Sequence, residues 1–263
     1  MPVYSKTKTK ETQRSNTALI SEWFGHWKKD SIEKGLKQIQ YESMYTSSFL
    51  TYFKKGDVVL EAGCGLSRYC VWLEDRGVNT FGIDIIKEAI VEGKRYMKKH
   101  GYRSELKVGD VRKLPYSSNK FDGYISLGVL EHFESFDDVR KSLAEAFRVL
   151  KPGGRVFISI PNPIAIHMIP EKIMDVFGIK SGITHYPLNK QDLLKVAKEN
   201  KFIIVTHGVH DFYFPIYSYF YMILRRDIWI LKSMLKYTLN VFDAVPVLKD
   251  FGSGIHVVLQ KPL

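Results

Sequence analysis

Residues 58–73 read VVLEAGCGLSRYCVWL, and this stretch decides the fold. A short apolar run typical of a strand is followed by Gly63 and Gly65 and then by a pattern typical of a helix. Glycine at such a turn can adopt positive φ and lets a ligand approach the backbone, while the start of the helix offers free N–H groups. The third glycine of the dinucleotide pattern G-x-G-x-x-G is missing, because Arg68 stands in its place. Glu61 would repel a pyrophosphate but suits a ligand that carries an ammonium group, so the loop disfavours an NAD(P) enzyme.

Strands and helices alternate outward from this loop, along residues 56–160. The predicted strands are 57–60, 80–83, 105–108, 123–127 and 155–160, and the predicted helices are 67–76, 86–99 and 137–150. This alternation predicts a doubly wound α/β fold, with a parallel sheet and helices on both faces. Because ligands of such sheets bind beyond the carboxyl ends of the strands, we expect the functional residues directly after each strand.

Two acids follow the second and third of these strands. Asp84 ends the strand TFGID and can accept hydrogen bonds from both hydroxyls of a ribose; the alternative is that it caps the next helix. Asp110 can accept from an adenine amino group while the N–H of Val111 donates to the ring; the alternative is an ordinary turn residue. Each acid alone is weak evidence. Their occurrence at successive strand ends, beside the glycine loop, favours a nucleoside ligand.

The regions on either side of the alternating pattern have a different character. Residues 17–53 follow helical spacing, whereas residues 1–16 are polar and basic and are predicted to be disordered. Residues 211–249 are rich in aromatic side chains. The elements predicted after residue 160 are a helix at 189–200 and strands at 202–206 and 254–260.

Together with FDGYISLGVLEHF at 121–133 and LKPGGRVFISIPNP at 150–163, these segments resemble a known family. They are similar to the class I, Rossmann-like S-adenosylmethionine-dependent methyltransferases, in particular the small-molecule group that includes quinone-biosynthesis and sterol methyltransferases. The resemblance covers about residues 56–208 and the last strand. It implies a seven-stranded, mostly parallel sheet with an antiparallel last strand, which IHVVLQ at 255–260 suits. It also implies S-adenosylmethionine as the cofactor, S-adenosylhomocysteine as the product and a small-molecule acceptor.

The resemblance extends to single residues and to the division of the chain. In the family, an acid and a glycine loop hold the methionine end of the cofactor, later acids hold ribose and adenine, and the residues after the fourth strand line the methyl-transfer site. The matching residues are Glu61, Gly63, Cys64, Gly65, Asp84, Ile85, Asp110, Val111, Gly128 and Val129. The expected domains are a disordered basic tail at 1–16, a helical cap at 17–55, and a methyltransferase domain at 56–263 with a helical, aromatic cap insertion at about 211–249.

Glu131 and His132 follow the fourth strand and are the candidate catalytic residues. A histidine can take a proton from a hydroxyl or amine nucleophile near neutral pH. Many members of the family carry a similar Leu-Glu-His segment with different substrates, so a positioning role stays open. His185 and Tyr186, before the helix predicted at 189–200, are candidates to face the substrate, with ordinary loop residues as the alternative. No spacing of His, Cys, Asp and Glu in the sequence suggests a metal site.

The formal net charge of +11 is spread along the chain, with no zinc-finger or ribonucleoprotein motif. A nucleic-acid methyltransferase is therefore a lesser alternative, and Leu127–Leu130 stand where amino-methylating members carry Asn/Asp-Pro-Pro-Tyr/Phe. A non-catalytic protein that binds S-adenosylmethionine or S-adenosylhomocysteine is a second alternative. The N-terminal residues lack an apolar signal segment, so the expected location is the cytoplasm.

Residues 212–235 read FYFPIYSYFYMILRRDIWILKSML and leave three interpretations open. They predict a cap helix packed on the core, an apolar substrate pocket, or a helix that lies on an anionic membrane surface. The apolar part before Arg225 is shorter than the roughly 20 residues that a membrane span requires. A hydrophobic acceptor such as a quinone or a lipid precursor fits the second and third interpretations. The oligomeric state and the methylated atom are not encoded in any of these patterns.

Overall fold

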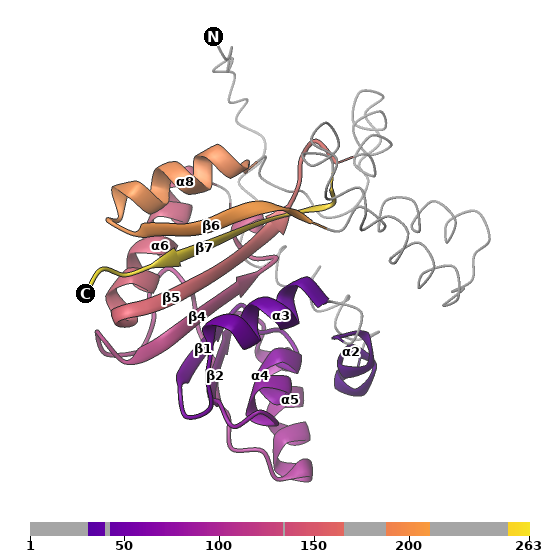
Figure 1. The fold of residues 1–263 in the computed structure, drawn as a ribbon. Coiled ribbons are helices and arrows are strands. Elements are labelled where there is room, and N and C mark those ends of the chain that lie inside the picture. The colour runs from indigo at the N-terminus through magenta and orange to yellow at the C-terminus, as the bar shows by residue number, and fades with distance from the viewer. Residues whose placement is uncertain (1–30, 40–42, 134, 166–187, 211–251) are drawn as a thin grey trace, which may run out of the picture.

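The structure is a computed structural model and is drawn in Figure 1. It describes residues 31–39, 43–133, 135–165, 188–210 and 252–263. The predicted tail, the first part of the N-terminal helical cap, the whole of the cap insertion at about 211–249, and the substrate candidates His185 and Tyr186 lie outside the described residues.

A seven-stranded sheet forms the centre of the described residues, with the order β3-β2-β1-β4-β5-β7-β6. The strands are β1 (Val58–Ala62), β2 (Asn79–Asp84), β3 (Glu105–Val108), β4 (Phe121–Leu127), β5 (Leu150–Pro161), β6 (Ile203–His210) and β7 (Gly254–Gln260). Strands β1 to β5 pair in parallel, and β7 is antiparallel to both β5 and β6. The predicted α/β fold with an antiparallel last strand is therefore confirmed.

Helices cover both faces of this sheet (Figure 1). They are α2 (Ile32–Ile39), α3 (Ser43–Tyr52), α4 (Arg68–Glu74), α5 (Lys87–His100), α6 (Phe136–Val149) and α8 (Lys190–Glu199), with a short 3-10 helix η1 (Leu130–His132). On one face, buried residues such as Leu143 of α6 and Val196 of α8 pack with Tyr124 of β4. On the other face, Phe49 of α3 and Tyr69 of α4 pack with other sheet residues. Burial of both faces explains why the central strands read as nearly continuous apolar runs.

Local signals in the sequence fix several helix ends. The hydroxyl of Ser135 accepts a hydrogen bond from the amide of Asp138 and begins α6. Asn189 and Asp192 form a reciprocal capping box at the start of α8. Gly101 ends α5 with a φ of 78°, a left-handed conformation that glycine adopts without a Cβ clash.

Strand β5 begins at Leu150, five residues before the predicted start at 155. Leu150 pairs with Phe121, and the register then shifts before Gly123 pairs with Arg155. The intervening Lys-Pro-Gly-Gly sequence predicts a turn, whereas the structure accommodates it as an irregularity at the start of a long strand. The side chains of Leu150 and Phe121 are both buried in the same core, and this burial favours the early pairing.

Candidate cofactor site

The loop after β1 is bonded to the end of β2 through the backbone. The N–H groups of Gly63 and Cys64 both donate to the carbonyl of Ile83, at 2.8 and 3.0 Å. The N–H of Gly65 donates to Oδ2 of Asp84 at 2.8 Å. Parallel pairing aligns the carboxyl ends of β1 and β2, so these contacts place the glycine loop directly beside the acid that ends the second strand.

Gly63 also brings the loop against the segment that follows β4. Its φ is 79°, and a Cβ at this position would lie 2.2 Å from Cγ2 of Val129. No side chain can be accommodated there without movement of Val129, because real Cβ atoms do not approach other atoms so closely. The close approach needs glycine for two reasons, conformation and space. Loops from β1 and β4, distant in the sequence, therefore meet at one edge of the sheet.

Glu61 lies in β1, two residues before Gly63, and is 5% exposed. Its Oε2 accepts hydrogen bonds from the amide and the thiol of Cys70, each at 3.1 Å, and no described residue donates to Oε1. Burial raises the pKa of Glu61 to about 7, against the hydrogen bonds from Cys70 and the charge of Arg68, which lower it. A cationic partner for Oε1 would stabilise the ionised form.

Asp84 is buried and rigidly held by backbone amides. Its Oδ2 accepts from Gly65 and its Oδ1 accepts from Ile86, both at 2.8 Å. Burial raises the pKa of Asp84, while the backbone hydrogen bonds oppose the rise. Each oxygen keeps a second lone pair, so the carboxylate can accept from two further hydroxyl groups without losing its own supports. The alternative that Asp84 caps α5 is not confirmed, because the N-cap is Ile86 without a side-chain hydrogen bond and Asp84 bonds the Ile86 amide just before the helix.

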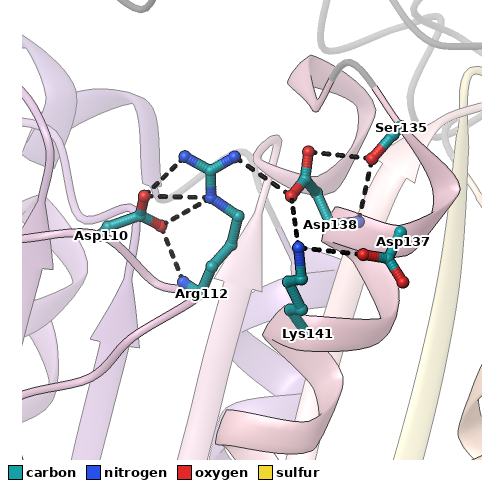
Figure 2. A network of polar contacts seen from close by, with 6 residues as sticks. All are labelled: Asp110, Arg112, Ser135, Asp137, Asp138 and Lys141. Atoms are coloured by element: carbon teal, nitrogen blue, oxygen red, sulfur yellow. Dashed lines mark hydrogen bonds and ion pairs between the residues drawn. The ribbon is translucent and has the colours of Figure 1, made fainter.

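Asp110, after β3, is held by an arginine that the sequence analysis did not single out (Figure 2). Arg112 Nη2 lies 2.6 Å from Asp110 Oδ2, Arg112 Nε lies 3.0 Å from both carboxylate oxygens, and the Arg112 amide donates to Oδ1 at 2.8 Å. Burial raises the pKa of Asp110, but the hydrogen bonds and charge of Arg112 outweigh burial and leave the pKa lowered. The other end of the guanidinium, Nη1, lies 3.3 Å from Asp138 of α6. The only sign of this contact in the sequence is that Arg112 stands two residues after Asp110.

Glu131 and His132 form η1, immediately after β4. Their facing atoms, Glu131 Oε1 and His132 Nε2, are 3.7 Å apart. Glu131 is 3% exposed, and its Oε2 has no hydrogen-bond partner among the described residues. Burial raises the pKa of Glu131 to about 8, with its own backbone amide opposing the rise. The Gly128 amide donates to the carbonyl of Ser159 at 3.0 Å, which ties this segment to β5.

The remaining predicted cofactor residues take different places. Val111 is buried and Ile85 is half-buried at the ends of their loops. The thiol of Cys64 packs in the core, where Ser67 Oγ lies 3.4 Å from it and where a Cβ on Gly82 would lie 2.9 Å from it. Cys64 is buried in a cluster with Ile90 of α5 and Leu106 of β3, so its side chain contributes to the packing of the core. Burial also raises the pKa of this thiol.

The described residues contain no group of three His, Cys, Asp or Glu side chains able to hold a metal ion. Within the same residues, every helix is too short or too polar to cross a lipid bilayer.

Comparison with known proteins agrees with this geometry. Residues 60–158 match the family model described as a methyltransferase domain. An S-adenosyl-L-methionine-dependent Diels-Alderase of Talaromyces variabilis is 27% identical over 215 residues, which cover 76% of this chain and 70% of that protein. A 2-methoxy-6-polyprenyl-1,4-benzoquinol methylase of Bos taurus is 37% identical over 111 residues, which cover 40% of this chain and 31% of that protein. Magnesium protoporphyrin IX methyltransferase of Synechocystis PCC 6803 superposes with a TM-score of 0.63 at 16% identity, covering 94% of this chain and 100% of that one.

The sheet order and the acids at its carboxyl edge define a Rossmann-like protein with a site suited to a nucleoside-containing ligand. Residues 60–158 form a methyltransferase domain, and the chain is similar to S-adenosylmethionine-dependent methyltransferases, as its sequence resemblance predicts. The chain spans 31% of the Bos taurus relative and 70% of the Talaromyces relative. These matches show the fold and a methyltransferase domain at residues 60–158.

Proposed function

We propose that the chain binds S-adenosylmethionine at the carboxyl edge of β1 to β4 and transfers its methyl group to a small acceptor. The observation that carries the proposal is the meeting of the β1 loop, the end of β2 and the β4 segment around Gly63, Asp84 and Val129. The chemistry of the cofactor fits what these residues offer. Glu61 is nearly buried and has an oxygen to which no residue in the described part of the chain donates, which suits an ammonium group. Asp84 presents two oxygens held by backbone amides, which suit two ribose hydroxyls.

When bound, S-adenosylmethionine supplies a methyl group that its positive sulfur already activates. The protein has to hold the acceptor in line with the methyl–sulfur bond and to exclude water, and orientation of this kind contributes about 7–11 kcal/mol. Glu61, Gly63 and Gly65 would hold the methionine end, with Asp84 and Ile85 on the ribose and Asp110 and Val111 on the adenine. Gly128 and Val129 would form the wall next to the acceptor.

Glu131 and His132 have separate roles in this proposal. Because its pKa is raised to about 8, Glu131 is mainly protonated at neutral pH and can donate a hydrogen bond rather than take a proton. We therefore assign Glu131 a positioning role on the acceptor side. His132 lies next to Glu131. If the substrate has to lose a proton before it is methylated, His132 takes that proton.

Methyl transfer is tested by incubating the full chain with S-adenosylmethionine labelled in its methyl group and with panels of quinols, sterols, small metabolites and transfer RNA. We expect label in one small-molecule class, and a loss of label with Gly63→Ala. Gly101→Ala is the matched control, since Gly101 has nearly the same φ, 78°, with nothing near its Cβ position. Cofactor binding without transfer to any class would support the non-catalytic alternative. Label in transfer RNA alone would support the nucleic-acid alternative.

We further propose that the methyl acceptor is a hydrophobic molecule. The quinol substrate in the name of the Bos taurus relative and the apolar residues 212–235 support it. In this proposal the protein works in the cytoplasm and contacts a membrane surface only peripherally, with the cap insertion at about 211–249 covering the methyltransferase domain. Co-sedimentation with anionic vesicles, of the full chain and of a variant lacking 212–235, tests the contact. Equal and negligible binding of the two proteins would refute it.

A further inference from the structure

The carboxylate proposed to recognise adenine is already occupied by three N–H groups of Arg112. Oδ1 of Asp110 receives the amide and Nε of Arg112, and Oδ2 receives Nε and Nη2 of the same residue, at 2.6 to 3.0 Å. A carboxylate offers about four lone-pair sites. Because each oxygen already bonds to Arg112, with the single Nε hydrogen shared between the two, an adenine amino group that bonds to Asp110 has to share an oxygen with Arg112 and competes with its donors.

Arg112 has a second carboxylate within reach (Figure 2). Its Nη1 lies 3.3 Å from Oδ1 of Asp138, in the first turn of α6, and its guanidinium carbon lies 5.5 Å from the centre of the Phe133 ring. Asp138 is held in place by the hydroxyl of Ser135, which donates to its Oδ2 at 3.0 Å. A guanidinium released from Asp110 would thus keep a fixed ionic partner on α6, so its release does not leave a charge unpaired.

We propose that Arg112 competes with the adenine amino group for Asp110, and that Asp138 holds Arg112 when adenine takes its place. This inference rests on the proposed function, because it assumes that adenine binds at Asp110. Arg112 is then a residue that sets cofactor affinity and base specificity by occupying the recognition group, rather than a direct support of the cofactor.

Two further properties follow from the position of the pair. The side chains of Arg112 and Asp110 are 25% and 34% exposed, so dissolved salt screens their attraction and weakens the competition. A base with a carbonyl in place of the amino group, such as hypoxanthine, can accept a hydrogen bond from Arg112 instead of donating one to Asp110. The arginine should therefore reduce discrimination against S-inosylhomocysteine, the hypoxanthine analogue of S-adenosylhomocysteine.

Calorimetry with S-adenosylhomocysteine and S-inosylhomocysteine on the full chain tests the proposal, with wild type, Arg112→Met, Arg112→Lys and Asp110→Asn. Arg95→Met is the matched control, because it removes the same charge from an exposed ion pair on α5. We expect Arg112→Met to bind S-adenosylhomocysteine three- to tenfold more tightly than wild type and to discriminate more strongly against S-inosylhomocysteine. Between 0.05 and 0.5 M NaCl, the difference between the two proteins should shrink. Arg112→Lys loses the fork and should lie between them, and it serves in place of Arg112→Met if that variant does not fold.

The possible failures are distinguishable. Weaker binding by a folded Arg112→Met variant, with unchanged base discrimination, would show that Arg112 supports the adenine site and would overturn the competition. Unchanged binding by Asp110→Asn, with wild-type binding intact, would remove Asp110 as the adenine group and the inference with it. Absence of binding by the wild type would instead refute the proposed function itself.

Discussion

Replacement of Gly63 by alanine tests the contact on which the cofactor site is built. Gly63 has a φ of 79°, and Gly101 has a φ of 78°. A Cβ on Gly63 would lie 2.2 Å from Val129 Cγ2, whereas a Cβ on Gly101 would have no atom within 4 Å. The two variants therefore place alanine at nearly the same positive φ and differ in the clash with Val129.

The expected cost follows from these two contributions. A left-handed conformation costs an ordinary residue about 1–2 kcal/mol, so Gly101→Ala should lower the free energy of unfolding by that amount and leave cofactor binding unchanged. Gly63→Ala adds the displacement of Val129, which overpacking data put at about 1–3 kcal/mol. Its total loss should be about 2–5 kcal/mol, and the displaced β4 segment should weaken the binding of S-adenosylhomocysteine by at least about tenfold, or about 1.4 kcal/mol.

Urea unfolding and calorimetry of the two variants provide the measurements. The double variant Gly63→Ala, Val129→Ala removes the obstructing methyl groups and should recover the part of the stability that overpacking cost, though not the part due to strain. If Gly63→Ala and Gly101→Ala lost the same stability and both bound S-adenosylhomocysteine like the wild type, the β1 and β4 loops would not meet as described and the reasoning would be refuted.

Three other predictions concern buried acids and a helix end. The pKa of Glu131 is raised from 4.5 to about 8. The contribution of neutral Glu131 to the free energy of unfolding is therefore complete below pH 4.5 and is lost progressively as the pH rises from 4.5 through 8. Glu131→Gln should therefore gain about 2–4 kcal/mol relative to wild type between pH 5 and 8 in urea unfolding, and a pH-independent difference would contradict the burial of this carboxyl. Glu61, with a pKa of about 7, should bind the ammonium of S-adenosylhomocysteine more tightly as the pH rises from 5.5 to 7.5, and Glu61→Gln should bind weakly with a flat profile in calorimetry. Asn189→Ala removes a reciprocal cap from α8 and should cost about 1 kcal/mol in thermal unfolding, with no change in cofactor affinity as the check that α8 is distant from the site.

Much of the fold was predictable because the strands of a doubly wound sheet are buried on both faces and end in polar turns. The last strand was predicted at 254–260 and is found there. The start of β5 was not predicted correctly. Lys-Pro-Gly-Gly is a local turn signal, whereas the pairing of Leu150 with Phe121 is a tertiary contact. Burial of distant side chains outweighs local preference in such cases.

Some features of the candidate site were also predictable from the sequence, and others were not. The positions of Gly63 and Asp84 follow from their place at strand ends, and the structure brings them together. Sequence could not show that the thiol of Cys64 faces the core, because a loop residue has no periodicity to assign its direction. Nor could it show the fork between Arg112 and Asp110, or the burial of Glu131, since the direction of a loop side chain and its burial are not encoded in local periodicity.

Calorimetry with S-adenosylmethionine on the wild-type chain and on Asp84→Asn tests the central claim most directly. Asn keeps the size of Asp84 and one acceptor for the Gly65 amide, but it loses the charge that would receive the ribose hydroxyls. Hydrogen bonds to a charged group contribute about 1.5–3 kcal/mol each, so we predict one cofactor bound per chain and at least about tenfold weaker binding by the folded variant. No binding by the wild type, or equal binding by both proteins, would contradict the account.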